Sequence, residues 1–272
     1  MAPGEKLLAV AVAAAQAGGE VLLRLFGSLR PDQIAEKGRN DWVTAADRAS
    51  EDVILQLLRH HAPEVGILAE ESGEHGSAGL RWVVDPLDGT ANFLNGFPHF
   101  AVSVALVEDG SPVLGVIFDP LRGELFTAVR GRGAWRNGHL LSASVRPGLA
   151  GSFLATGFPY RVHPVIDAYL RIFKRIFLRA GAIRRPGAAT LDLAHTAAGI
   201  FDGFFEFSLS PWDLAAGVLL VREAGGTATD LCGGPDVFSL GHIVAGGGAV
   251  QSELLEIIQS ELQGRELQDP LG

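Results

Sequence analysis

The sequence predicts an α+β first half followed by an α/β second half. In the first half, two helical patterns precede an alternating apolar run at 100–135, which turns at Asp109-Gly110 and again at 120–123. That pattern is typical of an antiparallel meander. In the second half, short apolar strands alternate with helical segments, which indicates an α/β layer. We therefore expect an N-terminal subdomain over 1–145 and a C-terminal subdomain over 146–272.

The composition limits the class of protein. The 272 residues are 47% hydrophobic and 19% charged, which is enough to bury a sizeable core. The net charge of −9 argues against nucleic acid or an anionic membrane surface as the default partner. If the substrate is anionic, metal ions must supply the positive charge. The single cysteine, Cys232, excludes an internal disulfide and a cysteine-based metal site.

The N-terminal segment has two interpretations. Lys6, an apolar stretch and an Ala-x-Ala pattern resemble a signal peptide. The apolar positions, however, continue from Val21 to Phe26 at helical spacing, so we interpret residues 4–26 as one amphipathic helix. No run reaches the ~18 apolar residues of a membrane span. We therefore expect a soluble, cytoplasmic protein.

The remaining elements follow from local patterns and turn residues. A strand-turn-strand is expected at 33–47, an amphipathic helix at 45–61, and two short buried strands at 65–72 and 82–90. In the second half we expect strands at 152–157, 182–185, 201–207, 227–231 and 243–247, and helices at 163–179, 188–199, 212–226 and 251–262.

Two aspartates stand where a buried strand ends. "WVVDPLDGT" places Asp85 and Asp88 three residues apart, although like charges repel. One interpretation is a plain turn, because Asp, Pro and Gly are turn formers. A similar string elsewhere in the chain supports this interpretation. "FDPLRGE" at 118–124 has Arg122 in place of the second Asp and suits a turn between meander strands. The other interpretation is a cation site.

Further acidic residues favour the cation site. Glu70 and Glu71 end one strand, and Asp213 opens a helix, where a cap or first-turn acid is also favoured by the helix dipole. Such termini converge on one face in α/β architectures. Clustered carboxylates need hard cations, and oxygen ligands favour Mg²⁺ over Zn²⁺. The eight histidines show no ligand spacing.

The residues after Asp88 indicate phosphate. Gly89 permits close approach of a ligand, and Thr90 begins a short helical turn whose free N–H groups suit a phosphoryl group. Phosphate beside Mg²⁺ ligands predicts metal-assisted hydrolysis of a phosphate ester.

Three motifs, "LAEES", "DPLDGTANF" and "WDLAAGVLLVREAGG", occur in this order and resemble those of the inositol monophosphatase family of Mg²⁺-dependent, lithium-sensitive phosphatases. The flanking strings "EKGRNDWVTAAD" and "RRPGAATLDLAHTAAGIFDGFFEF" are similar to its bacterial members, so the resemblance runs from about Val10 to Leu262. It implies a layered αβαβα sandwich, usually dimeric.

The resemblance also implies roles for individual residues. Thr90 would orient the attacking water, with Asp47 as its partner and proton acceptor. Glu70 and Lys37 would also be catalytic, and the position of Lys37 matches a loop that approaches the active site in the family. Two or three Mg²⁺ ions would be held by Glu70, Asp85, the Leu87 carbonyl, Asp88 and Asp213. The implied substrate contacts are Asp88, Gly89, Thr90, Arg184, Ala189, Glu206 and Asp213.

Three functions remain open. The first is a phosphatase for myo-inositol 1-phosphate and related polyol or sugar phosphates, which Glu206 and "RRPGAATLDLAH" favour. The second is a related phosphatase for fructose 1,6-bisphosphate, nucleotide 3′-phosphates or histidinol phosphate. The third is an interaction protein, because the resemblance also covers relatives that bind the transcription machinery.

Overall fold

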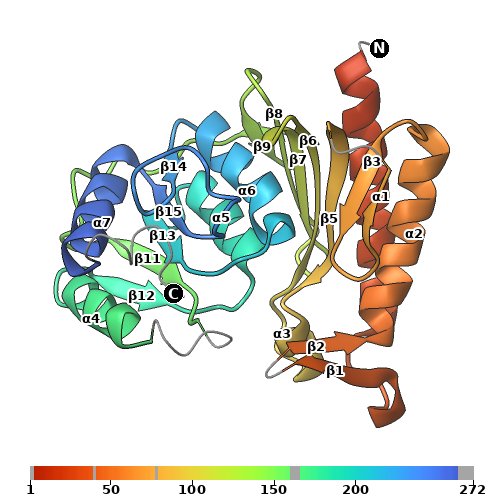
Figure 1. Cartoon of the computed structure of the whole chain (residues 1–272), viewed down its shortest axis with the longest axis horizontal. Coiled ribbons are helices and arrows are strands. Elements are labelled where there is room, and N and C mark those ends of the chain that lie inside the picture. Colours follow the sequence, from red (N-terminus) through yellow and green to blue (C-terminus); the bar gives the residue numbers. More distant parts are fainter. Residues whose placement is uncertain (1–2, 39–40, 77–78, 160–165, 263–272) are drawn as a thin grey trace.

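The computed structural model describes residues 3–38, 41–76, 79–159 and 166–262. Figure 1 shows five layers: two helices, a large sheet, two helices, a smaller sheet and two helices. The predicted αβαβα sandwich is thus confirmed.

The first half forms the outer helices and the large sheet. The eight-stranded sheet has the order β10-β9-β8-β7-β6-β5-β3-β4, and only β3 and β5 run parallel among its pairs in the described part of the chain. The helices are α1 (Pro3–Leu25), α2 (Ala45–His61), α3 (Thr90–Leu94) and the 3₁₀ turn η1 (Pro31–Gln33). The strands are the β1–β2 hairpin (Ile34–Gly38, Asp41–Thr44), β3 (Gly66–Ala69), β4 (Gly73–His75), β5 (Leu80–Asp88), β6 (Ala101–Glu108), β7 (Ser111–Asp119), β8 (Glu124–Val129), β9 (Ala134–Arg136) and β10 (His139–Leu140).

The second half forms the smaller sheet and four helices. Its strand order is β12-β11-β13-β15-β14, with β11 parallel to both neighbours and β15 antiparallel to both of its own. The strands are β11 (Phe153–Thr156), β12 (Ala182–Arg184), β13 (Gly203–Glu206), β14 (Thr227–Thr229) and β15 (Ile243–Gly246), and the helices are α4 (Ile166–Phe177), α5 (Ala189–Ala197), α6 (Pro211–Glu223) and α7 (Gly248–Glu261).

The predicted N-terminal helix is confirmed as the single helix α1. Within the described residues, α1 is the one helix whose length and hydropathy would suit a membrane span, over Gly4–Leu25. Its apolar face packs into the core instead: Ala11, Ala14 and Leu22 are fully buried, against α2 and the outer face of the large sheet. The small side chains let the helices approach closely.

Helices α5 and α6 fill the space between the two sheets (Figure 1). Gly115 of β7 allows the closest approach, because a Cβ there would lie 2.9 Å from the Ala216 backbone of α6. Gly217 of α6 does the same for α5, since its Cβ would lie 2.5 Å from the Cβ of Leu193. These contacts bring the N-termini of both helices to the end of β5.

The structure differs from the sequence expectations in small elements. The two-residue β10 and three-residue β4 were not predicted, because they are too short to show a period. The helix expected at 163–179 is seen as α4, and part of that range, 163–165, lies outside the described residues. The expected subdomain boundary falls between β10 and β11, and its role as a folding boundary stays a prediction.

Candidate metal centre and active site

A bulge in β5 places Asp85 and Asp88 on the same side of the sheet. Asp85 pairs with Ser103 of β6 and Asp88 pairs with Ala101, so three steps on β5 match two on β6. Residues three apart on a regular strand face opposite ways, and the extra residue corrects this. Ser50 anchors the bulge by donating from Oγ to the Pro86 carbonyl at 2.8 Å.

Asp213 reaches the same point from α6. Its Oδ2 accepts from the backbone N–H of Ser210 at 2.7 Å, and its own N–H donates to the Ser210 carbonyl at 3.1 Å. Asp213 therefore takes part in the capping box of α6 and also belongs to the acidic cluster, as the two interpretations of the sequence proposed. The partial positive charge of the helix N-terminus favours a carboxylate there.

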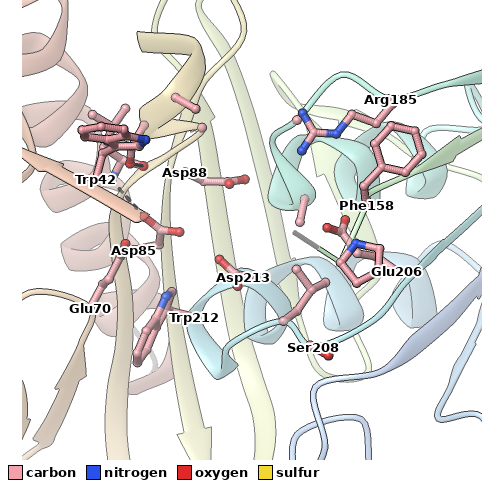
Figure 2. Close-up of a pocket in the computed structure, with 18 of the residues that line it drawn as sticks. Trp42, Glu70, Asp85, Asp88, Phe158, Arg185, Glu206, Ser208, Trp212 and Asp213 are labelled. Carbon is pink, nitrogen blue, oxygen red and sulfur yellow. Dashed lines mark hydrogen bonds between the residues drawn. The ribbon is translucent and has the colours of Figure 1, made fainter. Parts of the chain in front are cut away.

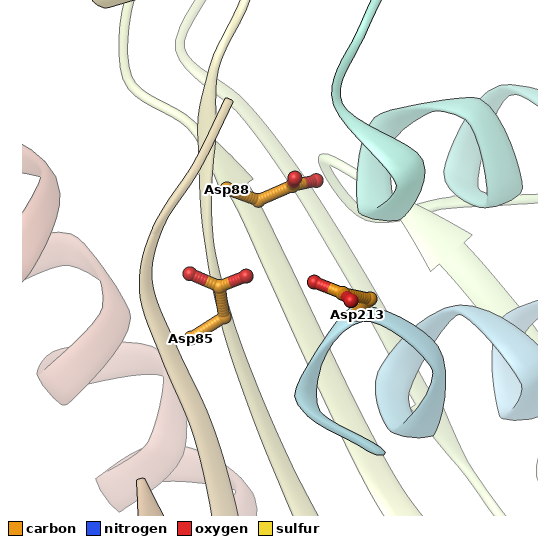
Figure 3. A group of neighbouring side chains, drawn as sticks. All are labelled: Asp85, Asp88 and Asp213. Carbon is orange, nitrogen blue, oxygen red and sulfur yellow. The ribbon is translucent and has the colours of Figure 1, made fainter. Parts of the chain in front are cut away.

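Three carboxylates converge in Figure 3. One oxygen each from Asp85, Asp88 and Asp213 lies within 4.8 Å of the others. Burial raises the pKa of Asp85 well above its usual value, and the charges of Glu70, Asp88 and Asp213 raise it further. Burial, followed by the charge of Asp213, raises the pKa of Asp88 to about 7. A cluster of oxygen donors that repel one another in this way suits a hard divalent cation.

Glu70 joins this group from the neighbouring strand. Its N–H donates to the Val84 carbonyl at 3.2 Å, which sets it beside Asp85 because β3 and β5 run parallel. Figure 2 shows Glu70 at the same end of the pocket as Asp85. The N–H of Glu71 donates to Glu51 Oε2 of α2 at 2.9 Å. This bond ties the backbone next to Glu70 to α2.

Asp47 and Thr90 form the predicted pair. Thr90 Oγ1 lies 3.1 Å from Asp47 Oδ1 and 3.0 Å from the Leu87 carbonyl oxygen, which are alternative acceptors for its proton. Asp47 Oδ2 accepts from the N–H and Oγ1 of Thr44 at 2.8 and 2.6 Å, which also caps α2. Burial raises the pKa of Asp47. A fixed, buried carboxyl of raised pKa beside a hydroxyl suits proton transfer.

Leu87 lies between these groups. Its N–H donates to Asp85 Oδ1 at 2.9 Å, and its carbonyl is one acceptor for Thr90. Gly89 follows with φ +92°, a left-handed conformation that glycine adopts without strain. This turn starts the predicted helical segment, which is α3.

A cavity of about 410 Å³ opens above the acidic cluster (Figure 2). It is lined by Trp42, Glu70, Asp85, Leu87, Asp88, Gly89, Thr90, Ala91, Phe158, Pro159, Arg185, Gly187, Ala189, Glu206, Phe207, Ser208, Leu209, Trp212 and Asp213. All four acids expected to bind metal, the N–H-bearing Gly89–Thr90 turn, and the expected polyol contacts Ala189 and Glu206 therefore face one cavity.

Arg184, an expected substrate contact, is not among the residues that line the cavity. Arg184 is exposed on β12, where its guanidinium lies 5.0 Å from the Phe153 ring centroid and Nη1 donates to the Ile183 carbonyl. Among the described residues that line the cavity, the arginine is its neighbour Arg185, whose guanidinium lies 5.7 Å from the Phe158 ring centroid. Lys37 belongs to β1, and its side chain is outside the described part of the structure.

Some cavity residues had no signal in the sequence. Trp42, Phe158 and Trp212 are aromatic residues, and such residues are more often in the core than in a site. Their role as cavity walls depends on how distant segments meet. Thr190, whose backbone and side chain both bond Asp88, was likewise not predicted.

Comparison with known proteins identifies the class of protein that has this fold and acidic cavity. The model of the inositol monophosphatase family matches residues 4–263. "Nus factor SuhB" of Salmonella typhimurium is 45% identical over 258 residues, 94% of this chain and 97% of the relative. The "Fructose-1,6-bisphosphatase/inositol-1-monophosphatase" of Aquifex aeolicus is 41% identical over 260 residues, with coverage of 95% and 97%.

Solved structures show the same likeness. The extragenic suppressor protein suhB from Bartonella henselae superposes with a TM-score of 0.90 at 44% identity, covering 93% of this chain and 98% of that one. Inositol monophosphatase from Anabaena (Nostoc) sp. PCC 7120 gives 0.83 at 39% identity, with coverage of 93% and 95%. This chain belongs to the inositol monophosphatase family.

The acidic cluster makes a prediction about stability and pH. In EDTA, the melting temperature of the wild type, relative to that of Asp88→Asn, should fall as pH rises from 6.5 to 8.5. Asp88 has a folded pKa of about 7 against 3.8 for the free group, and that of Asp85 is also raised. The folded state then holds more protons, so stability is present at low pH and is lost as pH rises, by up to about 1.4 kcal/mol per pH unit for the Asp88 proton.

Differential scanning fluorimetry across this window checks the prediction. Comparison with Asp88→Asn at each pH cancels the opposite contribution of His99 and His195, whose pKa values are lowered by burial and whose unfolded-state titration extends into this window. Saturating Mg²⁺ should flatten the pH dependence of the difference. A difference that is constant or rises with pH in EDTA contradicts a repulsive cluster.

Proposed function

We propose that this protein is a Mg²⁺-dependent phosphomonoesterase that hydrolyses myo-inositol 1-phosphate and related polyol or sugar phosphates. The observation that carries the proposal is the convergence of Asp85, Asp88 and Asp213 in one cavity that Thr90 also lines, with Thr90 bonded to the buried Asp47. The oxygen-only donor set fits Mg²⁺, and family membership supports phosphatase chemistry.

In this proposal the acids hold two or three Mg²⁺ ions. Glu70 and Asp85 would hold one, and Asp85, Asp88 and Asp213, with the Leu87 carbonyl, would serve the others. When bound, Mg²⁺ lowers the pKa of water and neutralises charge on the phosphoryl and leaving groups. Four formal negative charges on Glu70, Asp85, Asp88 and Asp213 match two divalent cations.

The other residues position the reactants. The hydroxyl of Thr90 orients the attacking water, and Asp47, which Thr44 holds in place, takes up the proton. The first N–H groups of a helix have no intrahelical acceptor, so those at the start of α3 suit the phosphoryl oxygens. Ala189 and Glu206 line the part of the cavity that receives the polyol, and Arg185 takes the place expected for Arg184.

Phosphate release from inositol 1-phosphate and fructose 1,6-bisphosphate, measured side by side over a Mg²⁺ titration, tests the proposal. We expect Mg²⁺-dependent release with the inositol ester preferred, none in EDTA, and none from Asp88→Asn. Efficient use of the bisphosphate would support the broader activity named for the Aquifex relative. Retained Mg²⁺-dependent turnover by Asp88→Asn would defeat the assignment.

The Asp47–Thr90 pair gives a separate prediction. Thr90→Val keeps the shape of the side chain and leaves the Thr44–Asp47 cap intact, but removes the hydroxyl bonded to Asp47. We expect kcat to fall by about 10²–10⁴-fold, the usual contribution of positioned proton transfer. Thr90→Ser, which retains the hydroxyl, is the matched control. Equal kcat in both variants would remove Thr90 from the mechanism.

We also propose a cytoplasmic homodimer, as the family resemblance implies. The exposed face of α4 supports this, because Leu170, Phe177 and the following Leu178 are 51, 61 and 71% exposed. Apolar side chains gathered in this way are typical of an interface. Sedimentation should show twice the chain mass, and Phe177→Glu should shift it toward the monomer. A monomeric wild type would refute the proposal.

A second function has support from relatives. Those named Nus factor SuhB favour the proposal that this chain also contacts the transcription machinery. Pull-down with RNA polymerase and its elongation factors, comparing wild type with Asp88→Asn, tests this. Retention by both proteins would indicate an interaction independent of catalysis, and retention by neither would dismiss it.

A further inference from the structure

The first turn of α5 clamps one oxygen of Asp88. The backbone N–H of Thr190 donates to Asp88 Oδ2 at 2.7 Å, and Thr190 Oγ1 donates to the same oxygen at 2.5 Å. Thr190 is fully buried. Two donors from one residue leave the carboxylate little freedom to rotate, and hydrogen bonds to a carboxylate are among the stronger ones in proteins.

The hydroxyl of Thr190 is not explained by packing or by helix chemistry. A buried threonine in a helix commonly bonds a carbonyl one turn earlier, and Thr196 of the same helix does so, donating to the Asp192 carbonyl at 2.7 Å. Thr190 instead reaches a residue on another layer. Valine has the same shape and would fill the site without a polar group. Packing alone therefore does not require the hydroxyl, and its bond to Asp88 accounts for it.

The start of α5 is held in place independently of Thr190. Asn92 of α3 lies with its Nδ2 2.8 Å from the His99 carbonyl oxygen, 3.0 Å from that of Pro186 and 3.2 Å from that of Gly187. Gly187 has φ +89°, and a Cβ there would lie 3.3 Å from Nδ2 of Asn92. The segment before α5 is therefore tied to the segment after Asp88, which fixes the distance between Thr190 and its acceptor.

We infer that Thr190 is a positioning residue for the metal centre. It commits Oδ2 of Asp88 to the protein and thereby orients the other oxygen for a cation shared with Asp85 and Asp213. The inference rests on the proposed metal-dependent function. Partners that hold a metal ligand in this way commonly change metal affinity or activity by about 10–100-fold when removed.

Isothermal titration of the full-length protein with Mg²⁺ alone, without substrate, tests the inference. Thr190→Val removes the hydroxyl and keeps the N–H, and we expect Mg²⁺ to bind about 10–100-fold more weakly. Thr190→Ser should restore most of the affinity. Thr196→Val, which removes a buried hydroxyl from the same helix, should leave the affinity unchanged. In turnover, Thr190→Val should need more Mg²⁺ for half-activation while the KM for inositol 1-phosphate at saturating Mg²⁺ changes little.

The outcomes separate this inference from the proposed function. Mg²⁺ binding that is equal or tighter in Thr190→Val overturns the positioning role and leaves the phosphatase proposal standing. Equal weakening by Thr196→Val would assign the effect to general loss of helix packing and also overturn it. No Mg²⁺ binding by the wild type overturns both proposals. If Thr190→Val does not fold, Thr190→Ala makes the same comparison.

Discussion

Repulsion among buried carboxylates is the constraint on which the site depends. Each acid of the cluster is held by a separate backbone donor: Asp85 by the Leu87 N–H, Asp88 by Thr190 and Asp213 by Ser210. These bonds fix the positions of the side chains but do not cancel their charges, and the pKa values of Asp85 and Asp88 stay raised. A rigid arrangement that is electrostatically unfavourable when empty is well prepared for a divalent cation.

The acidic cluster requires close packing between the large sheet and helices α5 and α6. Helices α5 and α6 must come close enough to the large sheet for their N-termini to meet the end of β5. Gly115 permits the approach of α6 to the sheet and Gly217 permits the approach of α5 to α6, because a side chain at either position would strike the facing helix. The bulge in β5 then turns two acids toward the helices, and the parallel β3 adds Glu70 from the next strand. The packing of the layers thus brings the acids together at one end of β5, an interior strand of the sheet.

Which of Arg184 and Arg185 lines the cavity was not predictable from the sequence. Arg184 is the last residue of β12 and Arg185 is the first after it, and successive side chains at a strand end point in different directions. The motif identified the segment, but which arginine faces the cavity depends on the register of β12 with β11 and on the ring of Phe158. Thr190 escaped prediction for a related reason, since its acceptor lies on a distant strand and leaves no local pattern.

By itself, the sequence determined the elements and the kind of chemistry. Periodicity and turn residues specify α1, α2, the meander and the alternating second half, because these depend on neighbours along the chain. The acids at element ends, Glu70, Asp85, Asp88 and Asp213, were likewise visible as a set. The family resemblance implied the pairing of Asp47 with Thr90 and the grouping of Asp213 with Asp85 and Asp88. Only the tertiary structure gave their contacts, with the three aspartates within 4.8 Å of one another, and only it decided that α5 clamps Asp88. Those contacts join segments far apart in the chain, and they arise from how the layers pack, which no local pattern encodes.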